Sequence, residues 1–141
     1  MTQCGAPAAA GPEESFAESL ILEIAHLLDR LAGSGASGAI DLRSLPMSEA
    51  DRAELEDFLG RGEVEATLST AGGSDVRETG YPGVWWICHR GSDGRISSET
   101  IEITLIPEIL KAHMDDLPIG LKRLREDIEN RQFEFQSGEN E

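Results

Sequence analysis

The chain has 141 residues, of which 39% are hydrophobic, enough for one folded domain with its own core. Its 12 lysines and arginines stand against 27 aspartates and glutamates, so the formal net charge is −15. This charge repels phosphate groups and anionic lipids, and no apolar run approaches the roughly 20 residues of a membrane-spanning helix. The composition therefore excludes nucleic acid and membranes as expected partners.

Cysteine use favours a reducing compartment. The chain has only Cys4 and Cys88, which cannot build a disulfide framework or cage a metal ion between them. The sequence contains no signal-peptide or lipidation pattern at its start. We therefore expect a cytoplasmic protein.

Residues 1–12 are small and lack a periodic apolar pattern, which predicts a flexible leader before a single domain over residues 13–131. Apolar side chains at helical spacing then predict an amphipathic helix that ends at Gly33. A connector rich in glycine and serine follows over residues 33–38. The apolar side chains of the helix are Phe16, Leu20, Ile24, Leu27, Leu28 and Leu31.

Residues 40–46 alternate in polarity as a short extended segment does, and a second helix is predicted after them. Ser48 and Asp51 resemble a capping box at the start of this helix, and Gly60 is a natural end. Its inward side chains are expected to be Leu55, Phe58 and Leu59.

From residue 63 the apolar period changes from about 3.6 to 2, which predicts strands instead of helices. Turns that contain glycine or proline separate four such segments, which together predict an antiparallel meander. The third segment has bulky residues on both faces, so we expect it at the centre of the sheet. The four segments are residues 63–68, 75–79, 84–90 and 100–105.

After the last strand, residues 108–114 predict a short helical turn, and Leu121, Leu124 and Ile128 predict a last helix. Residues 132–141 are expected to form a polar tail. The fold class that follows is α+β. We expect a four-stranded antiparallel meander with two N-terminal helices and one or two C-terminal helices packed mainly on one face.

Three segments of the sequence are similar to a known family: Ile40–Met47, Leu59–Val64 and Arg77–Trp86. They resemble the HupH/HyaF-type hydrogenase expression/formation proteins, in the C-terminal domain of those proteins, and the similarity covers residues 40–107. Its most specific part is the Glu-Thr-x-x-Pro-Gly-Val-Trp run that begins at Glu78. The resemblance implies an accessory protein of nickel-iron hydrogenase maturation, which acts on a hydrogenase subunit before the enzyme is assembled. It also implies that some members are longer and contain a second related segment.

Metal binding is an obvious question in a nickel-iron pathway. Cys88 and His89 are adjacent in a predicted strand, where neighbouring side chains point to opposite faces, so they cannot readily chelate one ion. His26 and His113 add no CxxC, HxH or HExxH pattern. We therefore expect no metal site and no cofactor, and Cys88 and His89 remain candidates only for a single exposed ligand or a redox thiol.

No catalytic signature is present in the sequence. Three histidines and many serines allow a catalytic triad in principle, but nothing in their spacing brings them together. The glycine-rich segments lack the lysine of a phosphate-binding loop. We expect no catalytic residues and a protein that is not an enzyme.

Partner binding is the remaining class of function, and an aromatic pair is its main candidate. Trp85 and Trp86 are adjacent in a strand and must face opposite sides, so only one can lie under helices that cover one face. Trp86 shares its face with Val84 and Cys88, which favours Trp86 as the core residue. The other tryptophan is expected on the open face, where either a partial covering, such as a dimer mate, buries it or a partner protein contacts it.

The leading hypothesis is a non-enzymatic, chaperone-like accessory protein that binds a hydrogenase subunit or another maturation protein through a sheet face, with a homodimer left open. The alternative is a thiol or metal carrier that uses Cys88 and His89. Gly83 is expected to need a backbone angle closed to other residues, so it can be structural as well as functional. The predicted partner-binding residues are Glu78, Tyr81, Pro82, Gly83, Trp85 and Trp86.

Overall fold

The structure is a computed structural model in which residues 15–131 are described. The predicted leader over residues 1–12, with Cys4, and the predicted tail over residues 132–141 lie outside this range. The described chain forms two compact units, one up to Pro107 and one from Glu108 onward. The single domain expected over residues 13–131 remains a prediction.

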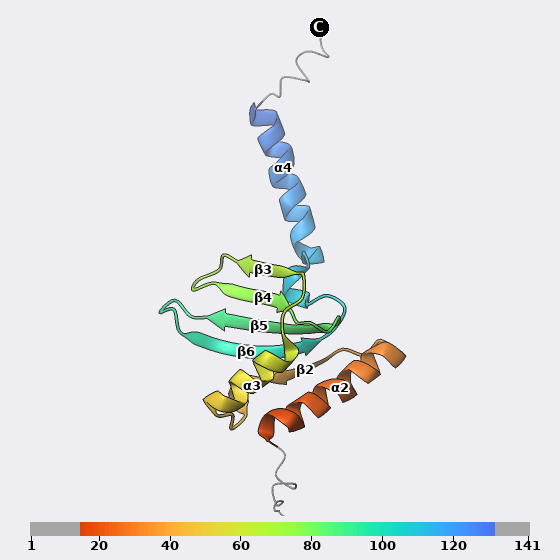
Figure 1. The fold of residues 1–141 in the computed structure, drawn as a ribbon. Helices are drawn as coiled ribbons and strands as arrows, with labels where there is room; N and C mark the ends of the chain where they lie inside the picture. The colour runs from red at the N-terminus through yellow and green to blue at the C-terminus, as the bar shows by residue number, and fades with distance from the viewer. Residues whose placement is uncertain (1–14, 132–141) are drawn as a thin grey trace, which may run out of the picture. The chain divides into compact units, whose positions relative to one another are not determined.

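Five antiparallel strands form one sheet in the order β2-β6-β5-β4-β3 (Figure 1). β5 pairs with both β4 and β6 and lies at the centre, as predicted. The four strands β3 to β6 follow one another as a meander, which confirms the α+β class. The strands are β2 Gly38–Asp41, β3 Glu65–Leu68, β4 Ser74–Glu78, β5 Val84–Arg90 and β6 Ile96–Ile103.

The edge strand β2 corrects the predicted strand count of four. Its residues alternate between half-buried and exposed, and Ile40 lies opposite Ile101 in an antiparallel pair with β6. The sequence pattern identified this segment as extended. Its hydrogen-bonding partner lies far along the chain, so no local pattern could assign it to the sheet.

Two helices cover one face of the sheet, α2 Phe16–Ser34 and α3 Glu49–Leu59. Ser48 caps α3 in a capping box with Asp51, as predicted. The buried side chains of α2 and α3 form one core with Leu42 of the 3-10 helix η1 Leu42–Ser44 and with residues of β5 and β6, and we call this side of the sheet the helix face. The core consists of Ala17, Leu20, Ile24, Leu27, Leu31, Leu42, Leu55, Leu59, Val84, Trp86, Ile101 and Ile103.

Phe58 corrects the predicted packing of α3. Leu55 and Leu59 are buried as expected, but 51% of the Phe58 surface is exposed. Leu55 and Leu59 are four residues apart and share one side of the helix, whereas Phe58 lies beside that inward line. Its ring instead contacts Tyr81.

The C-terminal unit begins with two short 3-10 helices, η2 Glu108–Leu110 and η3 Met114–Asp116, and continues as α4 Leu117–Arg131. Pro118 lies in the first turn of α4, where proline is tolerated. α4 has no buried residue in the structure as described. Within residues 15–131, no helix is long and apolar enough to cross a bilayer.

Candidate functional site

The loop between β4 and β5, Thr79–Gly83, is held by its own hydrogen bonds, and we call it the Tyr81 loop. The buried hydroxyl of Thr79 donates to the carbonyl oxygen of Val84 at 2.9 Å and accepts the backbone N–H of Tyr81 at 3.2 Å. Gly83 is half-buried and has a φ of 91°, in the backbone region that favours glycine. This angle confirms the expectation from the sequence.

The end of α3 is tied to the Tyr81 loop. The N–H of Gly80 donates to the carbonyl oxygen of Leu59 at 2.8 Å, and the N–H of Gly62 donates to that of Glu78 at 2.9 Å. A side-chain carbon at position 62 would lie 2.4 Å from the carbonyl oxygen of Thr79, so this close approach requires glycine. The first of these bonds fixes the Tyr81 loop against the end of α3, and the second holds the segment after α3 beside the end of β4.

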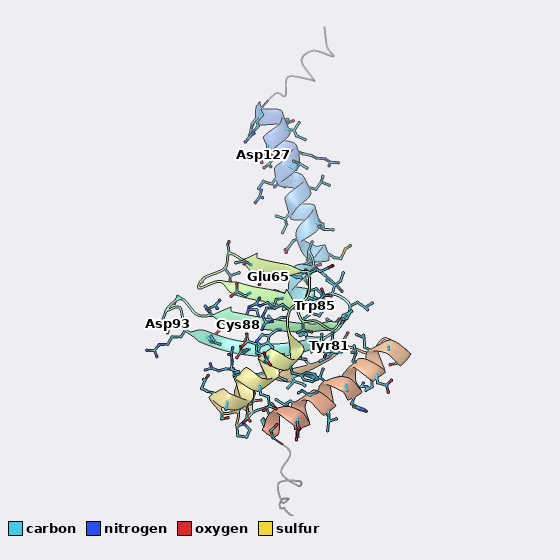
Figure 2. All side chains as sticks on the ribbon, in the orientation of Figure 1. Glu65, Tyr81, Trp85, Cys88, Asp93 and Asp127 are labelled. Atoms are coloured by element: carbon cyan, nitrogen blue, oxygen red, sulfur yellow. The ribbon has the colours of Figure 1, made fainter. Side chains whose placement is uncertain are left out.

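Tyr81 is thereby placed beside Phe58 of α3, and we call the two side chains the Phe58–Tyr81 platform. Their ring centroids are 6.0 Å apart and their planes differ by 15°. Phe58 is 51% exposed and Tyr81 is 42% exposed. Figure 2 shows Tyr81 near the end of α3. Aromatic side chains on a fixed backbone offer a large contact area at low entropic cost, so this platform is suited to binding another protein.

Only part of the predicted partner-binding set lies at the surface. Tyr81 and Pro82 are exposed and Glu78 is half-buried. Trp85 and Trp86 are only 6% and 3% exposed. The binding roles of these residues remain predictions, but Glu78, Tyr81 and Pro82 have the exposure that a contact surface needs.

The two tryptophans face opposite sides of β5, as strand alternation predicts. Trp86 packs in the core under α2 and α3, which confirms it as the tryptophan of the helix face. Trp85 lies on the opposite face, and of the two outcomes expected for it, burial is the one found. Its indole Nε1–H donates to the carbonyl oxygen of Thr104 at 3.1 Å. Val76 and Ile87 are also buried on this face, so both faces of the central strand carry packed apolar residues.

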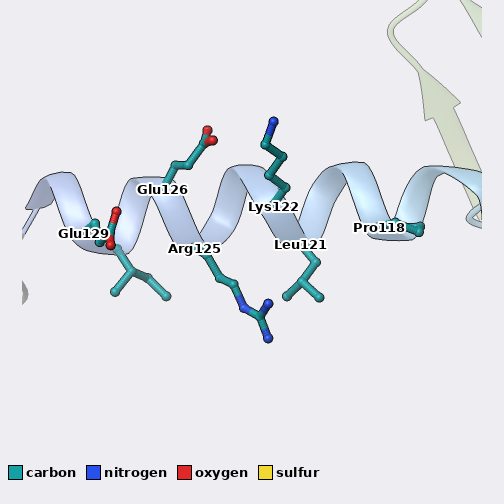
Figure 3. Close-up of a pocket in the computed structure, with 7 residues that line it drawn as sticks. Pro118, Leu121, Lys122, Arg125, Glu126 and Glu129 are labelled. Atoms are coloured by element: carbon teal, nitrogen blue, oxygen red, sulfur yellow. The ribbon is translucent and has the colours of Figure 1, made fainter.

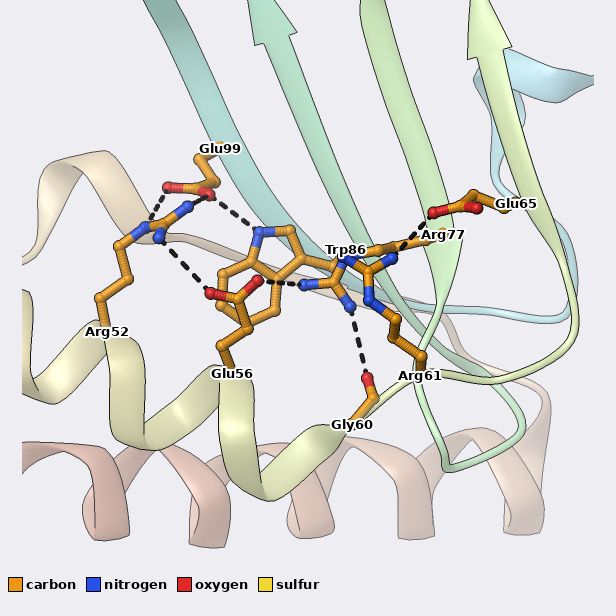
Figure 4. Close-up of polar contacts among 8 residues, drawn as sticks. All are labelled: Arg52, Glu56, Gly60, Arg61, Glu65, Arg77, Trp86 and Glu99. Carbon is orange, nitrogen blue, oxygen red and sulfur yellow. Dashed lines mark hydrogen bonds and ion pairs between the residues drawn. The ribbon is translucent and has the colours of Figure 1, made fainter.

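Charged side chains surround the indole of Trp86 (Figure 4). The indole Nε1–H donates to Glu99 Oε2 at 2.9 Å, and Arg52 forms a two-point ion pair with the same carboxylate, with Nε 3.1 Å from Oε1. The guanidinium carbons of Arg77 and Arg52 lie 5.0 and 5.6 Å from the centre of the indole. Glu56 pairs with both arginines, at 3.0 Å and 3.6 Å. We call Arg52, Glu56, Arg77 and Glu99 the Trp86 cluster.

Glu99 is 3% exposed, yet its carboxylate stays ionised. Burial opposes the charged form, but hydrogen bonds from Arg52 and from the Trp86 indole, together with the positive charges of Arg52 and Arg43, hold the pKa of Glu99 below its usual value. Burial also lowers the pKa of Arg77, whose guanidinium still carries its charge at neutral pH. The cluster is therefore a set of paired charges that joins α3 to β4, β5 and β6.

A hollow of about 300 Å³ lies beside the Trp86 cluster, with Cys88 in its lining. The two other arginines of this lining are also paired, Arg61 with Glu65 at 2.8 Å and Arg90 with Asp75 at 2.6 Å. Every arginine that lines the hollow thus has a carboxylate partner among the described residues. The hollow therefore offers a ligand no free guanidinium.

Cys88 and His89 lie on opposite faces of β5, as predicted, with Asp75 opposite Cys88 and Ser74 opposite His89. Burial raises the pKa of the Cys88 thiol, which favours its protonated form. His89 Nδ1 lies 2.7 Å from the hydroxyl oxygen of Ser74. Across residues 15–131, no three side chains of His, Cys, Asp or Glu are grouped so that they could hold a metal ion.

Two features of the site were not predicted, the exposure of Phe58 and the charges around Trp86. Arg52 and Glu99 are 47 residues apart, and no local pattern pairs them. The role of Thr79 in holding the turn, by contrast, could have been predicted from the Glu-Thr-x-x-Pro-Gly-Val-Trp run. A threonine just before a glycine-proline bend can bond the turn backbone through its hydroxyl.

Comparisons with known proteins agree on one family. Residues 15–130 match the HupH hydrogenase expression protein, C-terminal conserved region. The solved structure of the hydrogenase expression protein HupH from Thiobacillus denitrificans is similar with a TM-score of 0.77 and 37% identity, over 81% of this chain and 95% of that chain.

Curated relatives extend the similarity to longer proteins. The hydrogenase expression/formation protein HupH of Rhodobacter capsulatus is 34% identical over 108 residues, which are 75% of this chain and 39% of the relative. The hydrogenase-1 operon protein HyaF of Escherichia coli K12 is 36% identical over 89 residues, which are 62% of this chain and 31% of the relative. The chain therefore spans well under half the length of these two relatives.

Proposed function

The chain belongs to the HupH hydrogenase expression protein family through the C-terminal conserved region of that family, and from this premise we propose that it acts in hydrogenase maturation. Its role is that of a chaperone-like accessory protein in the cytoplasm, without catalysis of its own. It binds a hydrogenase subunit or another maturation protein. The names of the relatives, expression/formation proteins and a hydrogenase operon protein, support the pathway.

The observation that carries a binding role is the Phe58–Tyr81 platform. Both rings are about half exposed, and the backbone hydrogen bond from Gly80 to Leu59 holds the Tyr81 loop against the end of α3. A surface fixed in this way loses little conformational entropy when a partner binds. Glu78 and Pro82 of the predicted set flank Tyr81 in sequence, and Gly83 gives the loop its shape.

The alternative of a thiol or metal carrier has less support. Cys88 is 8% exposed and its thiol pKa is raised, both of which reduce its reactivity. His89 faces the other side of β5 and cannot join Cys88 at one ion. Stoichiometric retention of nickel or iron by the purified protein, lost in Cys88→Ala, would revive this alternative.

A capture experiment tests the proposed function. The tagged full chain is incubated separately with each purified hydrogenase subunit and each other maturation protein of the same pathway. We expect one of them to bind the wild type, and the Phe58→Ala/Tyr81→Ala variant to lose about tenfold or more in affinity.

Leu105→Ala is the matched control, because Leu105 is 78% exposed and lies outside the platform. This control should bind as the wild type does. Equal affinity of the platform variant and the wild type would place the binding surface elsewhere. If none of the purified proteins binds the wild type, the proposed function is wrong.

A further inference from the structure

α4 carries an exposed apolar stripe. Leu117, Leu121, Leu124 and Ile128 recur at spacings of four, three and four residues, which places them along one side of the helix. The first three are 49%, 47% and 57% exposed. Arg125 is directed to the same side as Leu121 (Figure 3). The stripe is therefore an apolar surface with a guanidinium beside it.

Among residues 15–131, α4 has no buried residue, whereas α2 and α3 are stabilised by packing. α4 has 15 residues, a length at which an isolated helix is marginal in water. Most helices in proteins are stabilised by burial of their apolar face. α2 and α3 bury such a face in the sheet core. A binding partner that covers the stripe would stabilise α4 in the same way.

Charge distinguishes α4 from α2 and α3. α4 contains four basic and three acidic residues, which gives a net charge of +1. α2 contains three acidic residues and one arginine, a net charge of −2, and α3 contains five acidic residues and one arginine, a net charge of −4. In a chain whose total is −15, a positive helix is an attractive partner for these two negative helices.

A groove of about 360 Å³ lies at α2 and α3 and has the complementary character. Its apolar lining is Ile21, Leu22 and Phe58, and 60% of the Leu22 surface is exposed. Glu18 and Glu54 complete the lining. The groove thus combines apolar side chains with carboxylates, where the stripe combines apolar side chains with arginines.

We propose that α4 of one copy of this chain docks in the α2–α3 groove of a second copy, and that the second copy returns the contact. Leu121, Leu124 and Ile128 would cover the apolar lining of the groove. Arg125 and Arg131 lie on the two sides of the stripe by helical spacing and would approach Glu18 and Glu54. The reciprocal exchange closes a two-fold dimer in which both stripes and both grooves are covered.

The dimer does not rest on the proposed function, but Phe58 belongs both to the groove and to the Phe58–Tyr81 platform, so a docked α4 and a maturation partner would compete for this side chain. The variants that test it leave both platform residues intact. Failure of the dimer and failure of partner capture can therefore be told apart.

The apolar contact is tested on the full chain by sedimentation velocity over a range of protein concentrations. The wild type should pass from monomer to dimer as its concentration rises. Leu124→Asp places a charge in the stripe and should raise the dissociation constant at least about tenfold. Ile119→Asp is the matched control, because Ile119 is 68% exposed on the opposite side of α4, and it should dimerise as the wild type does.

The charged contact is tested with two complementary variants. Glu18→Lys/Glu54→Lys reverses the groove and Arg125→Glu/Arg131→Glu reverses the helix, and each alone should dimerise more weakly because like charges then meet. In an equal mixture, each groove can meet a helix of opposite sign in the other copy. The mixture should therefore recover the dimer, and circular dichroism of each variant checks that it is folded.

Three results would overturn the inference. The first is a wild type that stays monomeric at every concentration, and the second is equal dimerisation of Leu124→Asp and the wild type. The third is a mixture of the two charge variants that recovers no dimer.

Discussion

Two aromatic pairs of this protein have opposite environments. Trp85 and Trp86 are adjacent in the sequence and both are buried, 6% and 3% exposed. Phe58 and Tyr81 come from different elements, stack on each other and are about half exposed. The pair that stands out in the sequence is therefore the buried one. The pair that forms only through the fold is the one available to a partner.

The difference follows from how each pair is made. Adjacent residues in a strand must face opposite sides, and both sides of the central strand β5 are packed. Phe58 and Tyr81 meet because the Tyr81 loop is hydrogen-bonded to the end of α3. Residue type alone does not separate a core aromatic from a binding aromatic, since burial decides between them.

Replacement of Trp86 should have the largest effect on stability. Trp86→Ala removes a buried indole, leaves a cavity in the helix face and deprives Glu99 of a hydrogen-bond donor. We expect a loss of about 3–5 kcal/mol in the free energy of unfolding. Chemical denaturation followed by circular dichroism measures it. A loss under about 1 kcal/mol would contradict the assignment of Trp86 to the core.

Trp85→Ala should have a similar but smaller effect, about 3 kcal/mol, because Trp85 is also buried. Trp85→Phe keeps most of the ring and loses mainly the hydrogen bond to the Thr104 carbonyl oxygen, so it should cost about 1 kcal/mol. The same denaturation curves give both values. If Trp85→Ala left stability unchanged but removed partner capture, Trp85 would be a binding residue after all and the contrast between the two pairs would fail.

Local sequence patterns predicted the elements better than the contacts between them. The capping residue Ser48, the limits of β5 and the left-handed backbone of Gly83 all follow from residues within one turn or one strand. The pairing of β2 with β6 and the ion pair of Arg52 with Glu99 join distant segments, and no alternation or spacing encodes them. Phe58 was misplaced because its apolar character does not show that it lies beside the inward line of Leu55 and Leu59, where its ring contacts Tyr81 of a distant segment.

Gly83→Val tests how the Tyr81 loop is built, and we expect a loss of about 1–3 kcal/mol. Gly83 has a φ of 91°, and a side-chain carbon there would lie 3.2 Å from a methyl carbon of Leu28. Gly94→Val is the matched control, because Gly94 has a φ of 83° with no atom within 4 Å of the added carbon. The control should lose less, and the difference in melting temperature measures the contact with α2. Equal losses would indicate backbone strain alone.

Glu99→Gln tests the charges that surround Trp86. At neutral pH the substitution should cost about 1–2 kcal/mol, because Arg52 is partly exposed and water replaces part of the lost pairing. Folding lowers the pKa of Glu99. The stabilisation that its ionised carboxylate gives the folded state is therefore fully present above about pH 4.3, the pKa expected in the unfolded chain, and is lost as the pH falls through the lower pKa of the folded state. The gap in unfolding free energy between wild type and Glu99→Gln should therefore shrink below about pH 4. A gap that stays constant across this range would contradict the ionised state of Glu99.

Tyr81→Ala should have the smallest effect on stability and the largest effect on partner capture. Tyr81 is 42% exposed, and the hydrogen bonds that hold its loop come from Thr79, Gly80 and other backbone groups. Loss of the ring removes the stack on Phe58 but leaves those bonds, so we expect a cost of about 1 kcal/mol or less. Affinity for the hydrogenase-pathway partner should nevertheless fall, because an exposed aromatic on a rigid loop contributes mainly to the complex.

Thr79→Val separates the effect on stability from the effect on capture. It keeps the volume at a buried position and removes the hydroxyl that holds the loop, so it should lower stability more than Tyr81→Ala does. If Tyr81→Ala instead lowered stability as strongly as Trp85→Ala and left capture intact, the platform would be structural, and the aromatic pair in β5 would remain the candidate for binding.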